Sequence, residues 1–171
     1  MLHSFRELEM NFAHLHLILN HIPVIGIPIA LAFLIFGIFS QSSPTQKFSL
    51  FMLFLLGPVA LPVYLTGEPA EKLIEHLPGF VESFVDSHED AALVSLILSI
   101  VTSIAAFVAL WFQKDEKKRR IFNFGVVGIA CITIISLLYT ANLGGQIRHT
   151  EIRAGSSAPL NTSNPETKKE K

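Results

Sequence analysis

Seven histidines are the residues of this chain best suited to chemistry, and three of them fall within eight positions. The stretch HLHLILNH opens an apolar segment with His14, His16 and His21. Neutral imidazoles bind metal ions and haem iron, and they titrate close to physiological pH. On a helix at 100° per residue, His14 and His21 share a face, whereas His16 projects roughly 140–160° away from both. The three rings therefore do not all point to one site.

A fourth histidine heads a polar stripe in another apolar segment. His88, Ser95, Ser99 and Thr102 follow an i, i+7, i+11, i+14 spacing, which places them on one helical face. In a membrane helix such a stripe is expected to face the interior of the bundle, where its polar groups find partners. We therefore expect His88 to lie across the bundle from residues 16–21, at a similar depth.

Two imidazoles that face each other between apolar helices are the axial ligands that a low-spin b-type haem requires. The second nitrogen of each ring then needs a hydrogen-bond acceptor. We expect His21 and His88 to be the axial ligands, with His16 as the next candidate. The chain would bind one haem b, or two, near the outer face of the membrane, the side on which the histidines are placed below. Arg148 and His149 follow the last apolar segment, where Arg148 could pair with haem propionates.

Two other functions use the same residues. A copper or zinc site needs imidazoles and carboxylates, here drawn from His14, His16, His21 and His88 with Glu68 or Glu89. In the other alternative the chain is a structural subunit whose histidines pair with acids. A haem site predicts a slot lined by Gly, Ala and Phe inside the bundle, whereas a metal site predicts His and Glu converging at its surface.

The composition of the chain argues against several other functions and cofactors. The 171 residues carry a formal charge of −1 without a field of Lys and Arg, so nucleic acid is not an expected partner. The one cysteine, Cys131, cannot form an internal disulfide, and we expect it to be buried. No Cys-x-x-Cys-His is present, which excludes covalent c-type haem. We find no catalytic triad or phosphate loop, so we expect no independent catalysis, although the chain could be a subunit of an oxidoreductase complex.

Four apolar blocks without charged residues must position these side chains. They cover residues 15–39, 48–65, 91–112 and 121–143. Each is long enough to cross a hydrocarbon core of ~30 Å. We therefore expect an all-α integral membrane four-helix bundle in residues 14–153, with helices at about 15–39, 48–65, 88–112 and 121–143. Residues 1–13 would form an N-terminal segment, and residues 154–171 a disordered polar tail.

The charges of the loops orient this bundle. Loops 40–47 and 113–120 hold most of the basic residues near helix ends, namely Lys47, Lys114, Lys117, Lys118, Arg119 and Arg120. The positive-inside rule puts both loops in the cytoplasm and both termini on the outer, periplasmic side. All seven histidines then lie on the outer side, which indicates a site there. We expect a multi-pass protein of the bacterial inner membrane.

The outer connection, residues 66–90, is acidic, with seven carboxylates and one Lys. Pro69 can open a short helix in it, and Pro78 with Gly79 can end that helix. One interpretation is an interfacial helix on the lipid bilayer with a solvated acidic face. The other is a docking patch for a basic carrier such as a periplasmic cytochrome c, which would receive electrons drawn from a quinol.

Small residues mark where helices could approach closely. Gly26, Ala30 and Gly37 lie in the first apolar block, and Gly125 and Gly128 in the last. They would admit a neighbouring backbone or a flat ligand. For Gly125 and Gly128 we favour helix packing.

Three short motifs resemble a known family. HLILNHIPVIG (16–26), with its His-x4-His-x-Pro spacing, is similar to the opening of small four-helix bacterial membrane proteins grouped as domain-of-unknown-function 2231. SHEDAALVSL (87–96) and ANLGGQIRHTEI (141–152) resemble the third-helix start and the Leu-Gly-Gly segment of that family. The resemblance implies the four-helix fold over about residues 13–153. It also implies a membrane haem or electron-transfer protein, with matching positions at His16, His21, His88 and Arg148 and a looser match at His149.

Overall fold

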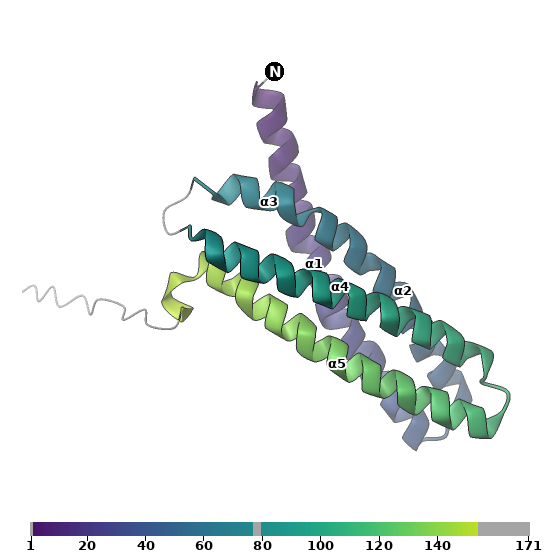
Figure 1. Ribbon diagram of the computed structural model, residues 1–171. Coiled ribbons are helices and arrows are strands. Elements are labelled where there is room, and N and C mark those ends of the chain that lie inside the picture. The colour runs from purple at the N-terminus through teal and green to yellow at the C-terminus, as the bar shows by residue number, and fades with distance from the viewer. Residues whose placement is uncertain (1, 77–79, 154–171) are drawn as a thin grey trace, which may run out of the picture.

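The computed structural model describes residues 2–76 and 80–153, and this part of the chain is helical (Figure 1). Its elements are α1 (Leu2–Phe39), α2 (Ser43–Leu65), α3 (Gly67–Ile74), α4 (Glu82–Trp111), α5 (Glu116–Arg148) and the 3-10 turn η1 (Thr150–Ile152). The all-α prediction is confirmed. The tail 154–171, which was expected to be disordered, lies outside the described residues, as do the side chains of residues 2–11, 74, 148 and 150.

Four of the helices are long and apolar enough to cross a membrane. The candidate spans are Phe12–Phe39, Ser43–Leu73, Glu82–Trp111 and Glu116–Ile147. Around the bundle the order is α1, α2, α4, α5, and each of these helices packs against two neighbours. Figure 1 shows α3 at one end of the bundle and the α1–α2 and α4–α5 connections at the other. A four-helix bundle of membrane-spanning length is thus the observed architecture.

The helices are longer than the apolar blocks from which we predicted them. The largest difference is in α1, which begins at Leu2, so residues 2–13 continue the first helix rather than form a separate segment. The start of α2 is set by Ser42, whose Oγ accepts a hydrogen bond from the Thr45 N–H. Asp115 caps α5 in the same way. An apolar block marks only the part of a helix that can lie in the hydrocarbon core of a membrane. The capping residues decide where the helix begins.

The interior of the bundle holds polar as well as apolar side chains, and its surface is apolar. Ser95, Ser99 and Thr102 are buried, as the stripe headed by His88 predicted. The Ser95 hydroxyl lies 2.7 Å from that of Ser136 on α5, and the Thr102 hydroxyl lies 2.7 Å from that of Thr133. Large hydrophobic side chains on all four long helices are exposed instead. This arrangement inverts that of a soluble protein and suits contact with lipid.

Glycine allows the closest helix contacts. A Cβ at Gly26 would lie 2.7 Å from Leu56 Cδ2, and one at Gly37 would lie 3.0 Å from the backbone nitrogen of Gln46. The expectation of close approach is confirmed at both positions. The tightest contact involves Gly57 on α2, where a Cβ would lie 2.6 Å from the Ser99 carbonyl oxygen. The sequence analysis did not single out Gly57.

Two expectations about α5 are wrong. Gly125 and Gly128 are exposed, and a Cβ at either would meet nothing within 4 Å, so they do not mediate helix packing within the chain. Cys131 is also exposed rather than buried. The reason is the rotation of the helix about its axis. The buried face of α5 is the one that carries Val126, Ala130, Thr133 and Leu137.

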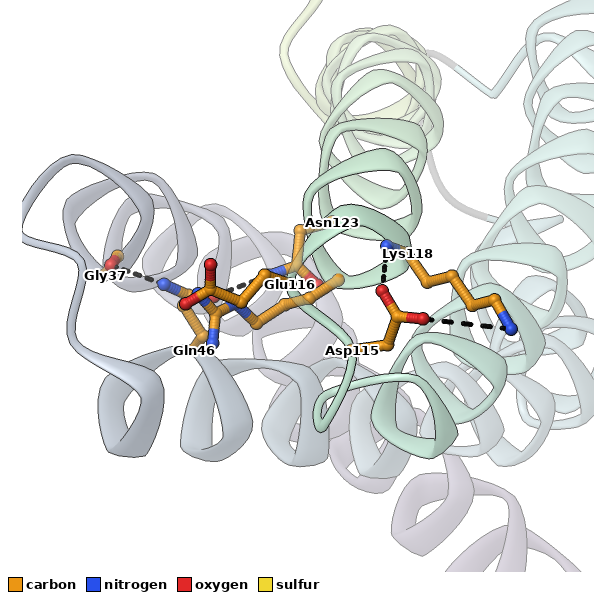
Figure 2. A network of polar contacts seen from close by, with 7 residues as sticks. Gly37, Gln46, Asp115, Glu116, Lys118 and Asn123 are labelled. Atoms are coloured by element: carbon orange, nitrogen blue, oxygen red, sulfur yellow. Dashed lines mark hydrogen bonds and ion pairs between the residues drawn. The ribbon is translucent and has the colours of Figure 1, made fainter.

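Three buried amides form a hydrogen-bonded chain at the end of the bundle where α1 joins α2, and Figure 2 labels two of them, Gln46 and Asn123. Gln46 Nε2 donates to the Gly37 carbonyl, Asn123 Nδ2 donates to Gln46 Oε1, and each bond is 2.8 Å long. Gln113 Nε2 donates to Asn123 Oδ1, also at 2.8 Å. We call this region, defined by Gly37, Gln46, Gln113 and Asn123, the glutamine end. The chain of amides connects α1, α2, α5 and the α4–α5 turn.

Replacing the central amide should destabilise the bundle. Asn123→Leu removes a donor from Gln46 and an acceptor from Gln113, which leaves two buried polar groups short of a partner. We expect the free energy of unfolding to fall by about 2 kcal/mol, measured by denaturant titration in micelles. Asn142→Leu is the matched control, because Asn142 lies on the same helix but is exposed. Equal losses in both variants would contradict a structural role for the amide chain.

Candidate functional site

The opposite end of the bundle carries the histidines. Here α2 ends, α4 begins and α5 ends, beside the first turns of the α1 span (Figure 1). We call this region, defined by His16, Thr66, His88 and Gly144, the histidine end. Two of its imidazoles are half-buried, His16 from α1 and His88 from α4.

His16 is held by the C-terminal end of α2. Its Nδ1 lies 3.0 Å from the Val63 carbonyl oxygen and 3.2 Å from Thr66 Oγ1. The last four carbonyls of a helix have no partner within it, so the end of α2 at Leu65 leaves the Val63 oxygen free to accept. Gly67 follows at once, and a Cβ there would lie 3.8 Å from His16 Cε1. The ring is thus oriented by backbone groups that the end of a helix exposes.

His88 is held in the same manner by α5. Its Nδ1 lies 3.0 Å from the Thr140 carbonyl oxygen, and the Thr140 hydroxyl lies 2.9 Å from that of Ser95. Gly144 leaves the room for this contact, because a Cβ there would lie 3.0 Å from His88 Cε1. The sequence analysis noted the Leu-Gly-Gly segment but did not connect Gly144 with His88.

These contacts define the tautomer of both rings. A carbonyl oxygen can only accept, so Nδ1 of His16 and of His88 carries the hydrogen and the Nε2 of each neutral ring keeps its lone pair. Both rings belong to the histidine end, although they come from different helices, α1 and α4. An imidazole that donates Nδ1–H to a carbonyl and keeps the lone pair of Nε2 is in the form in which histidine serves as a metal ligand.

His21 does not lie in this arrangement. It is exposed, and its Nδ1 contacts the Leu17 carbonyl oxygen of its own helix at 2.6 Å. His14 is exposed as well. His21 comes five positions after His16, a step that turns the helix by roughly 140°, so only one of the two rings can face α2 and α4. We expected His21 to be the ligand opposite His88, but the half-buried ring of α1 is that of His16.

The residues beyond α5 have other contacts. His149 is exposed, and its Nδ1 lies 2.8 Å from Glu151 Oε1. A hydrogen bond from its own backbone, together with the one to His149, holds the pKa of the Glu151 carboxyl below its ordinary value. The side chain of Arg148, the expected partner of propionates, lies outside the described part of the chain.

Arg153 has a structural role that the sequence analysis missed. Its Nε donates to the Gln146 carbonyl at 2.8 Å and its Nη2 to the Ile147 carbonyl at 3.0 Å. Its guanidinium also lies 4.7 Å from the centre of the Phe84 ring on α4. A basic residue just after a helix commonly binds the last carbonyls in this way, which is a signal that could have identified it.

The carboxylates of the connection 66–90 do not join the histidines. The predicted short helix opened by Pro69 is present as α3. Glu68 is paired with Lys72 at 2.8 Å, and Glu89 is exposed. Within residues 2–76 and 80–153, no three His, Cys, Asp or Glu side chains come together in a way that could hold a metal ion.

Comparisons with known proteins found no match. No protein-family model matches the chain, and no curated protein or solved structure is similar to it. The resemblance to the domain-of-unknown-function 2231 family therefore stays a prediction.

Proposed function

We propose that this chain is a membrane electron-transfer protein that binds b-type haem between His16 and His88. The observation that carries the proposal is the pair of half-buried imidazoles, each of which donates Nδ1–H to a backbone carbonyl and keeps Nε2 for a ligand. Both backbone acceptors belong to helices other than the one that carries the ring, so neighbouring helices orient the two ligands. The proposal replaces His21 with His16 as the partner of His88.

The residues present fit a haem better than a bare metal ion. The porphyrin of a haem supplies four nitrogen ligands to the iron, so a six-coordinate haem needs only two ligands from the protein. Copper and zinc sites usually take three or four ligands from the protein. Two imidazoles without a third ligand among the described side chains therefore favour haem, whereas a copper or zinc site would need His14 or His21 to turn inward.

The chain itself would tune and shield the site. The Val63 and Thr140 carbonyls make the imidazoles better electron donors by accepting their Nδ1 hydrogens. A side chain at Gly144 would press on the His88 ring, and one at Gly67 would touch that of His16. When bound, b-type haem supplies a one-electron Fe(III)/Fe(II) couple. Ligation by both histidines would leave no coordination position for oxygen, which suits electron transfer and not catalysis.

The partners follow from the surface charge at the histidine end. Glu68, Glu75, Glu82, Asp86, Glu89 and Asp90 are all exposed there. Such an acidic surface would attract a basic soluble carrier such as a periplasmic cytochrome c, with quinol in the membrane as the electron source. The proposed orientation has both termini and the histidine end outside, in the bacterial inner membrane. The chain would serve as a subunit or anchor of a redox complex.

The proposal is tested by the absorption spectrum of the full chain purified in detergent from cells supplied with haem. The dithionite-reduced minus air-oxidised spectrum should show a sharp α-band, and extraction should give one haem b per chain, or two. A flat spectrum from folded protein would overturn the proposal. Bound copper or zinc in the same sample would then support a metal site, and the absence of both would support a structural subunit.

A further inference from the structure

The glutamine end contains a cleft that the proposed electron transfer does not use. It has a volume of about 840 Å³ and lies between the last turn of α1 and the first turns of α5. Residues of the α1–α2 turn and of α2 also contribute to its wall. This end is opposite to the histidine end, so the cleft is independent of the histidine pair (Figure 1).

The wall of the cleft is positively charged. Lys117, Arg119 and Arg120 line it, together with one carboxylate, that of Glu116. Glu116 Oε1 lies 3.8 Å from Arg119 Nη2, so Arg119 is partly neutralised. Neither Lys117 nor Arg120 forms an ion pair with a described residue. Three cations and one carboxylate leave a formal charge of +2, which favours an anionic ligand.

Two buried amides also contribute to the cleft, those of Gln46 and Asn123. Each amide nitrogen carries two hydrogens, and the hydrogen bonds to Gly37 and to Gln46 use one from each nitrogen. One N–H of each amide therefore remains for a ligand. Phosphate oxygens accept such hydrogen bonds in addition to ion pairs with Lys and Arg.

The rim of the cleft is apolar and faces lipid. Phe39 is 81% exposed, Ile121 61% and Phe124 51%, and all three line the cleft. The cations thus stand directly beside the lipid-facing surface, at the depth where the charge-free part of α5 begins. A free phosphate ion would contact only the cations and the amides, whereas a phospholipid would also place its acyl chains along this apolar rim.

We propose that this cleft binds an anionic phospholipid, with its phosphate between Lys117, Arg119 and Arg120 and its acyl chains along Phe39 and Phe124. Basic pockets between membrane helices commonly bind such headgroups. The lipid would bridge α1 and α5, which pack together less extensively than the other neighbouring helices of the bundle.

The test is native mass spectrometry of the detergent-solubilised full chain, titrated with phosphatidylglycerol, phosphatidylcholine or inorganic phosphate. The wild type should retain phosphatidylglycerol in preference to phosphatidylcholine. The double variant Lys117→Gln/Arg120→Gln should bind phosphatidylglycerol about twenty-five-fold more weakly, since each cation near a membrane contributes about a factor of five in affinity. Both residues are exposed, so the fold should persist, which circular dichroism verifies.

The matched control is Lys114→Gln/Lys118→Gln, which removes the same charge from the same loop at residues that do not line the cleft. It should bind the lipid as the wild type does. Equal weakening in both double variants would overturn the proposal, because it would indicate general attraction by a basic loop. Equal retention of both lipids would also overturn it. Displacement of phosphatidylglycerol by millimolar inorganic phosphate would assign the cleft to free phosphate instead.

Discussion

His16→Ala and His88→Ala should each abolish the haem absorption of the purified protein, whereas His14→Ala and His21→Ala should retain it. The first pair of rings is half-buried and held by carbonyls of neighbouring helices, and the second pair is exposed on the outside of α1. Loss of either axial ligand removes half of the protein's contribution to iron binding. The measurement is the amplitude of the reduced α-band relative to protein, with circular dichroism as the check on folding.

A variant that displaces the His88 ring without removing it tests the same assignment independently. Gly144→Ala places a methyl group 3.0 Å from His88 Cε1, so the ring must shift from the Thr140 carbonyl. We expect haem affinity to fall by about tenfold, the size of effect seen when the support of a ligand is lost. Gly145→Ala is the control, because its methyl group would meet only Ile152 at an ordinary 3.5 Å. Loss of the α-band in His21→Ala but not in His16→Ala would contradict the assignment.

Gly57→Leu should prevent formation of the folded bundle, whereas Gly128→Leu should be tolerated. At Gly57 even a Cβ would lie 2.6 Å from the Ser99 carbonyl oxygen and would also collide with Ser103. The first of these is backbone, so α2 and α4 would have to separate, and the core built around Leu53 and Ala106 would open. Overpacking costs roughly 1–3 kcal/mol or more even where side chains can move. We expect a larger loss of stability for Gly57→Leu, because the backbone of a helix cannot move aside as a side chain can.

The readout is the fraction of protein that elutes as a single folded species in detergent, followed by thermal unfolding. Gly57→Ala should be intermediate, with a reduced midpoint. Gly128→Leu introduces the same side chain into an apolar helix at a position where nothing lies within 4 Å. If Gly57→Leu and Gly128→Leu unfolded at the same temperature, α2 and α4 would not cross at the distance described.

The sequence could reveal the elements because their signals are local. Charge-free blocks of the length that a membrane-spanning helix needs predicted four helices, and four helices of that kind are present. The stripe of Ser95, Ser99 and Thr102 predicted a buried face of α4, because polar groups in a membrane helix seek partners inside the bundle. Pro69 predicted α3 by the same kind of local rule. The occurrence of histidines at one end of the bundle could also be foreseen, since helix lengths alone determine it.

Only the tertiary structure decided how each helix is rotated about its axis. Helices α1 and α5 are apolar on nearly every side, so the sequence offers no amphipathic pattern to tell His16 from His21, or Gly128 from Val126. The rotation is set by contacts between helices, such as Gly26 with Leu56 and Gly57 with Ser99. In α1 the His16 ring is turned inward and that of His21 outward. In α5, contacts with α4 such as that of Thr133 with Thr102 leave Gly125, Gly128 and Cys131 on the surface. By itself the sequence thus determined the four spans and the end at which the histidines gather. The packing between helices decided which of those imidazoles are half-buried, because the direction of a side chain depends on neighbours that are distant in the chain.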